Sequence, residues 1–237
     1  MNFLEKLIFG NKPDALMRKP RRAIYAQMYN VKLVWNCSKY EDFGIERLFR
    51  LFLVCAQFVL PGLYIREISG RCSVLARKIS VEIYVIVKIL LYLLILFCFQ
   101  PKVWWSWISI YLIIDTVLYL LGLIFLNTEY RKPASYKRNL LMTFINYVEI
   151  ILGFATIYYS AFKDYIFNLQ SSIDAIYFSF ISATTIGYGD MYPLSNLAKF
   201  ACIIQSFLSF LFAVFFIGVF LANFDKSGYI NNSNKKL

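Results

Sequence analysis

The sequence is poor in charged residues and contains no histidine. Of its 237 residues, 16% are charged and 59% are hydrophobic, and the mean hydropathy is +0.57. A soluble domain of this length needs about a quarter of its residues charged to cover its surface. The deficit excludes an ordinary soluble domain and a disordered chain, and it indicates a surface that faces lipid. Without histidine, the commonest metal ligand and proton shuttle, metal-assisted hydrolysis is not expected.

Cysteine is scarce and irregularly spaced. The five cysteines form an odd set without a Cys-x-x-Cys pair, which argues against a disulfide framework and a zinc knuckle. We interpret them as core or lipid-facing thiols. Neither a nucleophile with its base nor a cluster of metal ligands is visible, so we expect no enzyme and no bound cofactor.

Long apolar runs are abundant. Each should be a helix, because a helix satisfies its own backbone hydrogen bonds in lipid. The sequence therefore predicts an all-α protein with four transmembrane helices in a lipid bilayer. Four segments reach the roughly 20 residues that cross a bilayer core about 30 Å thick, namely 81–99, 103–126, 140–160 and 197–224.

A further apolar stretch, residues 173–192, is too short and too broken to cross the membrane. It contains two close glycines and ends at Pro193. Non-helical backbone at membrane depth is tolerated only where protein or a water-filled cavity surrounds it. We therefore interpret this stretch as a re-entrant loop between the third and fourth spans.

Basic residues predict the orientation. Residues 1–80 hold fourteen Lys and Arg, the 127–139 linker holds four and the tail after residue 224 holds three, whereas the alternate connections hold three in total. By the positive-inside rule both termini and the linker are cytoplasmic, and the re-entrant loop enters from outside. The net charge of +11 is then mainly an orientation signal at a cell (plasma) membrane. A nucleic-acid partner is not expected.

A motif follows a short helical run at 173–183. The residues there are Thr184-Thr185-Ile186-Gly187-Tyr188-Gly189-Asp190. This pattern resembles the selectivity filter of the potassium-channel superfamily. The resemblance implies a filter formed by residues 185–189, with K⁺ as the permeant ion held at Thr185, Ile186, Gly187 and Tyr188. Because the superfamily's pore is four-fold and this chain carries one filter, it also implies a homotetramer.

The residue types in this motif suit cation coordination. Glycine allows the positive φ that turns successive carbonyls towards one axis, and Gly187 and Gly189 occupy those positions. Thr185 can offer its hydroxyl as well as its carbonyl, while Ile186 and Tyr188 are expected to turn their side chains outward into packing. The helix at 173–183 would direct its partly negative carboxyl end towards the ion path, which favours a cation there.

The resemblance also implies residues that support the filter, with Thr184 before it and Asp190 after it. In the superfamily this aspartate is held by a hydrogen bond from an aromatic residue of the pore helix, usually a tryptophan. Here the aromatic pair is Tyr177-Phe178. Only the Tyr177 hydroxyl can donate that hydrogen bond.

The fourth span is expected to line the cavity. Counting from Asp190 places Ser209 where many members of the superfamily have a hinge glycine, although Gly218 is the better candidate for a flexible point. No span carries arginines at every third position, so steep voltage gating is not expected. Four apolar residues near one face either close the pore by dewetting or pack between helices: Phe210, Ala213, Ile217 and Leu221.

Three charged residues lie inside the first three spans. Lys88, Asp115 and Glu149 all fall roughly 10–17 Å from the cytoplasmic ends of their helices. We predict that Lys88 forms an ion pair with Asp115 or Glu149. A pH-sensitive or lipid-sensitive switch is the functional alternative.

Five regions are expected along the chain. We expect helix within 45–65 to be interfacial or cytoplasmic and to be stopped by Pro61-Gly62. A cytoplasmic sensor would have to use the amino-terminal region or an unidentified regulatory protein. The regions are a basic amino-terminal region (1–80), a peripheral two-helix unit (81–126), a cytoplasmic linker (127–139), a pore domain (140–224) and a short cytoplasmic tail (225–237).

The leading hypothesis is a potassium-selective channel that passes ions passively. One alternative is a subunit of a potassium-uptake transporter, but such relatives carry four degenerate pore loops in one chain, and no second Gly-x-Gly loop occurs here. The other alternative is a non-selective or regulatory channel-like subunit, against which the intact filter motif argues.

Overall fold

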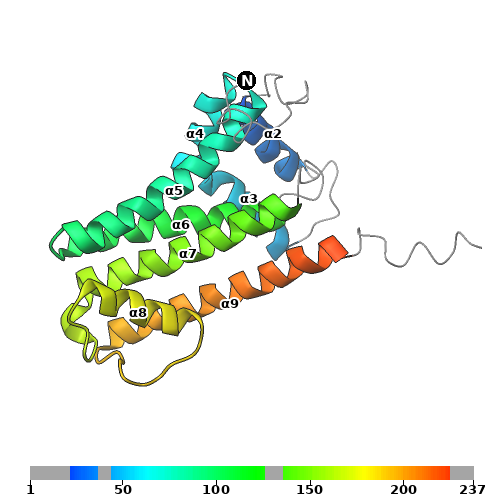
Figure 1. The fold of residues 1–237 in the computed structure, drawn as a ribbon. Helices are drawn as coiled ribbons and strands as arrows, with labels where there is room; N and C mark the ends of the chain where they lie inside the picture. Colours follow the sequence, from blue (N-terminus) through cyan, green and yellow to red (C-terminus); the bar gives the residue numbers. More distant parts are fainter. Residues whose placement is uncertain (1–21, 37–43, 126–135, 225–237) are drawn as a thin grey trace, which may run out of the picture. The chain divides into compact units, whose positions relative to one another are not determined.

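The described part of the chain is helical throughout, apart from turns and one isolated bridge (Figure 1). The computed structural model describes residues 22–36, 44–125 and 136–224; the expected linker up to residue 135 and the 225–237 tail lie outside them. The predicted all-α class is confirmed. The elements are α2 (Ala23–Asn36), α3 (Ile45–Ala56), α4 (Pro61–Gly70), α5 (Val74–Cys98), α6 (Val103–Phe125), α7 (Tyr136–Ala161), η2 (Lys163–Tyr165), α8 (Ser172–Ala183) and α9 (Asn196–Phe224).

Four of these helices are long and apolar enough to cross a membrane, which confirms the predicted spans. Within the described residues the number rises to five if α3 and α4 are counted as one broken span. The short apolar helix α8 lies between the last two spans in sequence, where the re-entrant stretch was expected. The spanning stretches are Val74–Cys98, Val103–Gly122, Leu140–Ala161 and Asn196–Phe216.

Pro61 begins a helix instead of ending one, so the predicted role of Pro61-Gly62 was wrong. Helix α3 ends at Ala56, α4 starts at Pro61, and the two are bent by 62°. Proline suits the first helical position because the N–H that it lacks would have no intrahelical partner there. It also disfavours helix in the residue before it, and Leu60 is extended. The break therefore precedes the proline.

The described residues group into two compact units that divide α5 and α6 between them. The amino-terminal unit contains α2, α3, α4, α5 up to Ile86 and α6 from Ile114. The carboxyl-terminal unit contains the other halves of α5 and α6 together with α7, η2, α8 and α9. The observed division falls inside α5 and α6, and the expected peripheral unit at 81–126 stays a prediction.

Polar contacts connect the short helices of the amino-terminal unit to one another. The amide of Ile24 on α2 donates to Glu67 Oε2 on α4 over 3.1 Å, and the Gln27 side chain donates to the carbonyl of Val54 on α3 over 3.0 Å. Helix α2 is thus oriented by its contacts with α3 and α4.

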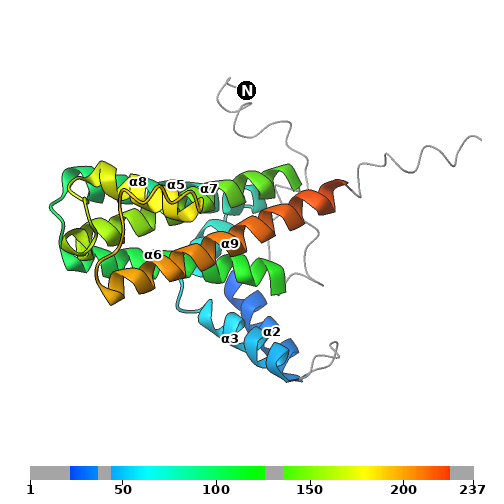
Figure 2. The same cartoon turned by 90° about the horizontal axis from the view of Figure 1, so that it is seen from below.

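The carboxyl-terminal unit has an apolar core shared by α5, α6 and α7. The centre of this core consists of the buried residues Tyr92, Leu96, Leu112, Leu152 and Ala155. Helix α7 also packs along α8 and α9, which run beside it in both views (Figures 1 and 2). The re-entrant segment therefore packs against α7.

Candidate ion pathway

A capping box begins α8. Ser171 Oγ accepts a hydrogen bond from the Asp174 amide over 3.2 Å, while Asp174 Oδ2 accepts from the amides of Ser171 and Gln170 over 2.7 and 3.0 Å. The carboxylate also lies at the positive end of the helix dipole. Partial burial raises the pKa of Asp174, but the hydrogen bonds outweigh it and the net pKa is lowered. These contacts fix where the helix starts.

The loop after α8 returns to the end of the unit at which it began. Figure 1 shows it leaving the carboxyl end of α8 and running back to the start of α9. Ile166, just after η2, and Pro193, just before α9, form an antiparallel bridge. Beside this bridge the Phe167 amide donates to the Tyr192 carbonyl over 2.9 Å, and the two rings stack with centroids 4.9 Å apart. The segment therefore follows a re-entrant path.

Left-handed backbone recurs at every second residue of the filter motif. The φ angle is 59° at Thr185, 55° at Gly187 and 82° at Gly189. In an ordinary strand successive carbonyls point to opposite sides, whereas inverting alternate residues turns them to the same side. A Cβ added at either glycine would meet nothing within 4 Å in this chain. Glycine is thus required by the backbone conformation and not by lack of space.

Thr185 is the left-handed residue that the sequence did not predict. A β-branched residue in this conformation costs about 1–3 kcal/mol, so neighbouring contacts must hold it there. Its amide donates to the carbonyl of Ser182 over 3.3 Å, and the next amide, of Ile186, donates to the carbonyl of Ile181 over 3.0 Å. The last turn of α8 therefore holds the first residues of the filter.

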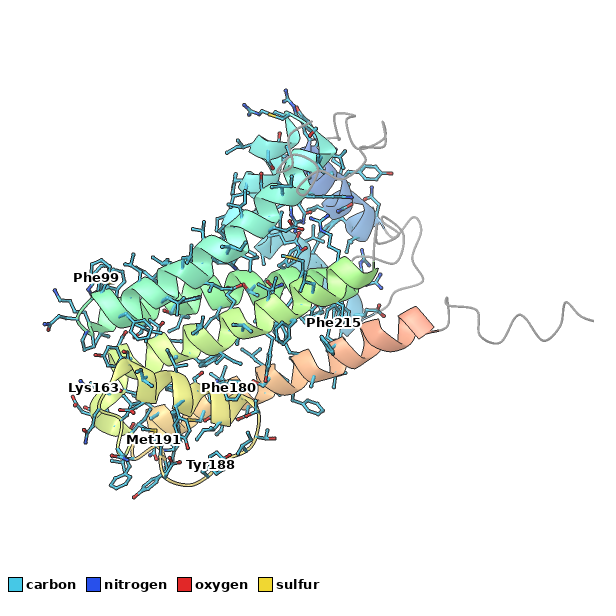
Figure 3. The ribbon with its side chains drawn as sticks, in the orientation of Figure 1. Phe99, Lys163, Phe180, Tyr188, Met191 and Phe215 are labelled. Atoms are coloured by element: carbon cyan, nitrogen blue, oxygen red, sulfur yellow. The ribbon has the colours of Figure 1, made fainter. Side chains whose placement is uncertain are left out.

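The side chains between the left-handed residues lie on the surface of this chain. Ile186 is 49% exposed and Tyr188 is 70% exposed. Figure 3 shows Tyr188 on the arc of the loop, beyond the helices. The packing expected for both side chains is not supplied by the described residues of a single chain.

The hydrogen bond implied for Asp190 is present. The Tyr177 hydroxyl donates to Asp190 Oδ2 over 2.8 Å, and this bond to the carboxylate raises the pKa of Tyr177. Phe178 is buried instead and meets the ring of Tyr158 edge-on, with centroids 5.0 Å apart. Thr184 Oγ1 donates to the Phe180 carbonyl over 2.8 Å, within the last turn of α8. The aromatic pair thus divides into one donor and one packing residue.

A tyrosine on α7 contacts the carboxyl end of α8, and the sequence analysis did not identify it. The Tyr147 hydroxyl donates to the Ala183 carbonyl over 3.0 Å, one residue before the filter motif. Its ring lies 5.7 Å from that of Phe212 on α9. The only signal in the sequence was a polar group in an apolar span, which does not indicate a partner.

The candidate gate residues on α9 lie on different faces of the helix. Ser209 is 5% exposed and faces the interior of the unit, whereas Phe210 is 65% exposed. Ala213 and Gly218 are exposed as well, and the side chains of Ile217 and Leu221 lie outside the described part of the structure. Ser209 therefore belongs to the packed face of the helix and not to the face that carries Phe210.

The structure identifies a partner for Lys88. Its Nζ lies 2.9 Å from Glu149 Oε1, and the two side chains are 4% and 0% exposed. Asp115, the other partner left open by the sequence, lies in the amino-terminal unit, where its Oδ2 accepts a hydrogen bond from the Tyr84 hydroxyl over 2.9 Å. The ion pair thus connects α5 to α7.

Comparison with known proteins supports the class indicated by this geometry. Residues 146–226 match the ion channel family. That range contains most of α7, the whole of α8 and the filter motif, and α9. The sequence of this part of the chain is therefore similar to that of ion channels, and the long apolar helices indicate a multi-pass membrane protein.

Two relatives carry the name "Potassium channel K2". One, from Plasmodium falciparum (isolate 3D7), is 32% identical over 133 residues, and the other, from Plasmodium berghei (strain Anka), is 31% identical over 134 residues. Each match covers 48% of this chain but only 9% of the relative. No solved structure matches the chain. These similarities confirm the resemblance to the potassium-channel superfamily.

Proposed function

We propose that this chain is a subunit of a potassium-selective channel that conducts K⁺ passively. The observation that carries the proposal is the left-handed backbone at Thr185, Gly187 and Gly189 within a re-entrant loop. A short strand with its carbonyls on one side offers oxygens that replace the hydration shell of K⁺ without any charged ligand. The carbonyls at residues 185–188 and the Thr185 hydroxyl would form successive sites, each weak enough to release the ion.

Helix α8 adds a favourable potential for a cation. Its carboxyl end, with a partial negative charge, directly precedes the filter motif, and its amino end is capped by Asp174. The bond from Tyr177 to Asp190 holds the other end of the motif. The filter is thus supported at both ends by the same helix.

We further propose that four copies surround one axis, with both termini cytoplasmic in the plasma membrane. One chain carries one filter strand, which cannot enclose an ion by itself. The exposed apolar side chains of Ile186 and Tyr188 and of the α9 residues Phe207, Phe210 and Val214 suit burial against neighbouring copies or the cavity. On α9, Phe210 and Ala213 are then the candidate gate residues that face away from the chain's own core.

Ion flux from liposomes tests the proposal. Liposomes that contain the purified protein should release K⁺ or Rb⁺ rapidly when loaded with either ion, and should release Na⁺ far more slowly when loaded with Na⁺. Gly187→Ala should abolish this flux, because alanine disfavours the φ of 55°. The matched control is Gly62→Ala on α4, where an added Cβ would lie 3.6 Å from Asp115 Oδ1, an ordinary van der Waals contact. Equal Na⁺ and K⁺ flux would instead support a non-selective subunit, and absence of flux a regulatory one. Native mass spectrometry would test the four-fold assembly.

A further inference from the structure

Three fully buried polar side chains meet where α7, α8 and α9 pack together. Tyr158 on α7, Ser179 on α8 and Gln205 on α9 are each 0% exposed. None of them belongs to the filter motif, and none was identified from the sequence. We call them the Tyr158–Gln205–Ser179 network.

Hydrogen bonds run through this network without a gap. The Tyr158 hydroxyl donates to Gln205 Oε1 over 2.6 Å, and Gln205 Nε2 lies 2.8 Å from both the carbonyl oxygen and the Oγ of Ser179. Ser179 Oγ in turn donates to the Ile151 carbonyl on α7 over 2.7 Å. The network therefore connects all three helices and returns to the first.

The chemistry of the groups determines how the Gln205 amide is oriented. The Ser179 carbonyl can only accept, so the NH₂ group must face α8, and the amide oxygen then faces the Tyr158 hydroxyl. No other orientation satisfies both neighbours. Since the three side chains are buried, loss of Gln205 leaves the Tyr158 hydroxyl with only a weak acceptor, Cys202 Sγ at 3.5 Å, in a medium of low dielectric.

The position of the network relates it to the filter. Ser179 lies one turn before Ala183, the last residue of α8, and the filter begins directly after that. Gln205 lies on the same buried face of α9 as Ser209 and Phe212. Phe212 contacts Tyr147, which donates to the Ala183 carbonyl. A rotation or shift of α9 would thus reach α8 through two sets of contacts, one at Gln205 and the other through Phe212 and Tyr147.

We propose that Gln205 is a positioning residue for ion selection. Its side-chain amide fixes the rotation of the pore helix α8 about its own axis and so aligns the filter carbonyls, and it couples the position of α9 to the filter. The inference rests on the proposed function. It goes further by assigning selectivity control to a residue of α9 outside the filter motif.

The first experiment compares single variants in the liposome assay. Gln205→Glu keeps an acceptor but replaces the NH₂ group, which lies within reach of two Ser179 oxygens, by a carboxyl group with at most one proton, and Gln205→Met removes both functions. We expect each to lower the ratio of K⁺ to Na⁺ flux by about tenfold, the equivalent of one buried hydrogen bond of about 1.4 kcal/mol. Thr156→Val is the matched control, because Thr156 is equally buried but its Oγ1 donates to the Leu152 carbonyl of its own helix. It should keep the wild-type ratio.

The second experiment separates positioning from mere stability. The triple variant Tyr158→Phe, Ser179→Ala and Gln205→Met removes the polar side chains together, and the acceptors that remain are the Ser179 and Ile151 carbonyls inside helices α8 and α7. The melting temperature in detergent should therefore recover towards wild type. If Gln205 acts by position, the selectivity ratio stays low in this stable protein. Recovery of the ratio together with stability would overturn the proposal, as would single variants with wild-type ratios. Failure of the wild type to select K⁺ would instead overturn the proposed function.

Discussion

Each of the two units contains an ion pair, but the two pairs differ in their exposure to water. In the amino-terminal unit, the ion pair of Arg50 with Glu46, 2.8 Å long, joins adjacent turns of α3 and leaves the Glu46 side chain 49% exposed. In the carboxyl-terminal unit, the pair of Lys88 with Glu149 joins two helices and is buried. An exposed partner regains water when its pair is lost, whereas a buried one does not. The cost of a lost contact is therefore determined by its surroundings more than by its type.

The largest expected effect is that of Lys88→Met. It leaves Glu149 as a buried charge without this partner and should lower the free energy of unfolding by about 3–5 kcal/mol. Chemical denaturation in detergent would measure the loss, with little change in ion selectivity. Adding Glu149→Gln should recover most of the stability. Arg50→Met, in the amino-terminal unit, leaves Glu46 with its side chain 49% exposed and should cost clearly less than Lys88→Met, because Glu46 regains water. Equal losses from Lys88→Met and Arg50→Met would contradict the comparison.

Two glycines provide the second comparison. A Cβ at Gly153 on α7 would lie 2.9 Å from Ile113 Cγ1, inside the packed core, so Gly153→Ala should cost about 1–3 kcal/mol. A Cβ at Gly70 on α4 would lie 2.6 Å from Arg77 Nη2, the end of a long side chain that can shift at the expense of the hydrogen bond from its Nε to the Arg66 carbonyl. Melting temperatures should therefore fall clearly for Gly153→Ala and little for Gly70→Ala. Shortening Ile113 to valine in the first variant should restore part of the loss.

A smaller effect is expected for Tyr177→Phe, at an exposed contact of the carboxyl-terminal unit. The hydrogen bond to Asp190 is lost, and overall stability should hardly change because the contact is exposed to water. Because this bond holds the Asp190 end of the filter motif, we expect K⁺ currents in planar bilayers to decline faster during sustained opening. Tyr177→Trp, which restores a donor, is the matched variant. A decline at the wild-type rate in Tyr177→Phe would show that the bond does not support the filter.

The smallest effect is a pH dependence at the start of α8. The folded-state pKa of Asp174 is lowered, so its stabilising effect is fully present above the unfolded value of about 3.9 and is lost as the pH falls through the lower folded value. The contribution is about 0.5 kcal/mol, as for other helix caps. Melting temperatures measured from about pH 6 down to about pH 3 should fall as the pH is lowered through these pKa values. Asp174→Asn should remove this part of the decrease. An unchanged decrease in that variant would assign it to other carboxylates.

Much of the fold could be predicted because its signals are local. Hydropathy located the four spans, and the sequence after Ala183 located the filter motif, since both depend on residues adjacent in the chain. The prediction at Pro61 was wrong because a proline is compatible with the end of a helix and with its first turn, and here it begins α4. The roles of the filter and gate residues stay predictions that the flux experiments test.

The sequence by itself determined that the chain crosses a membrane, where it does so and which short motif it presents, because apolar length and glycine spacing require no partner. Only the tertiary structure decided that Lys88 pairs with Glu149, that Ser209 and Phe210 lie on different faces, and that Gln205 reaches Ser179. Each of these depends on the rotation of one helix against another. That rotation is selected by the packing of many side chains at once, and no single segment encodes it.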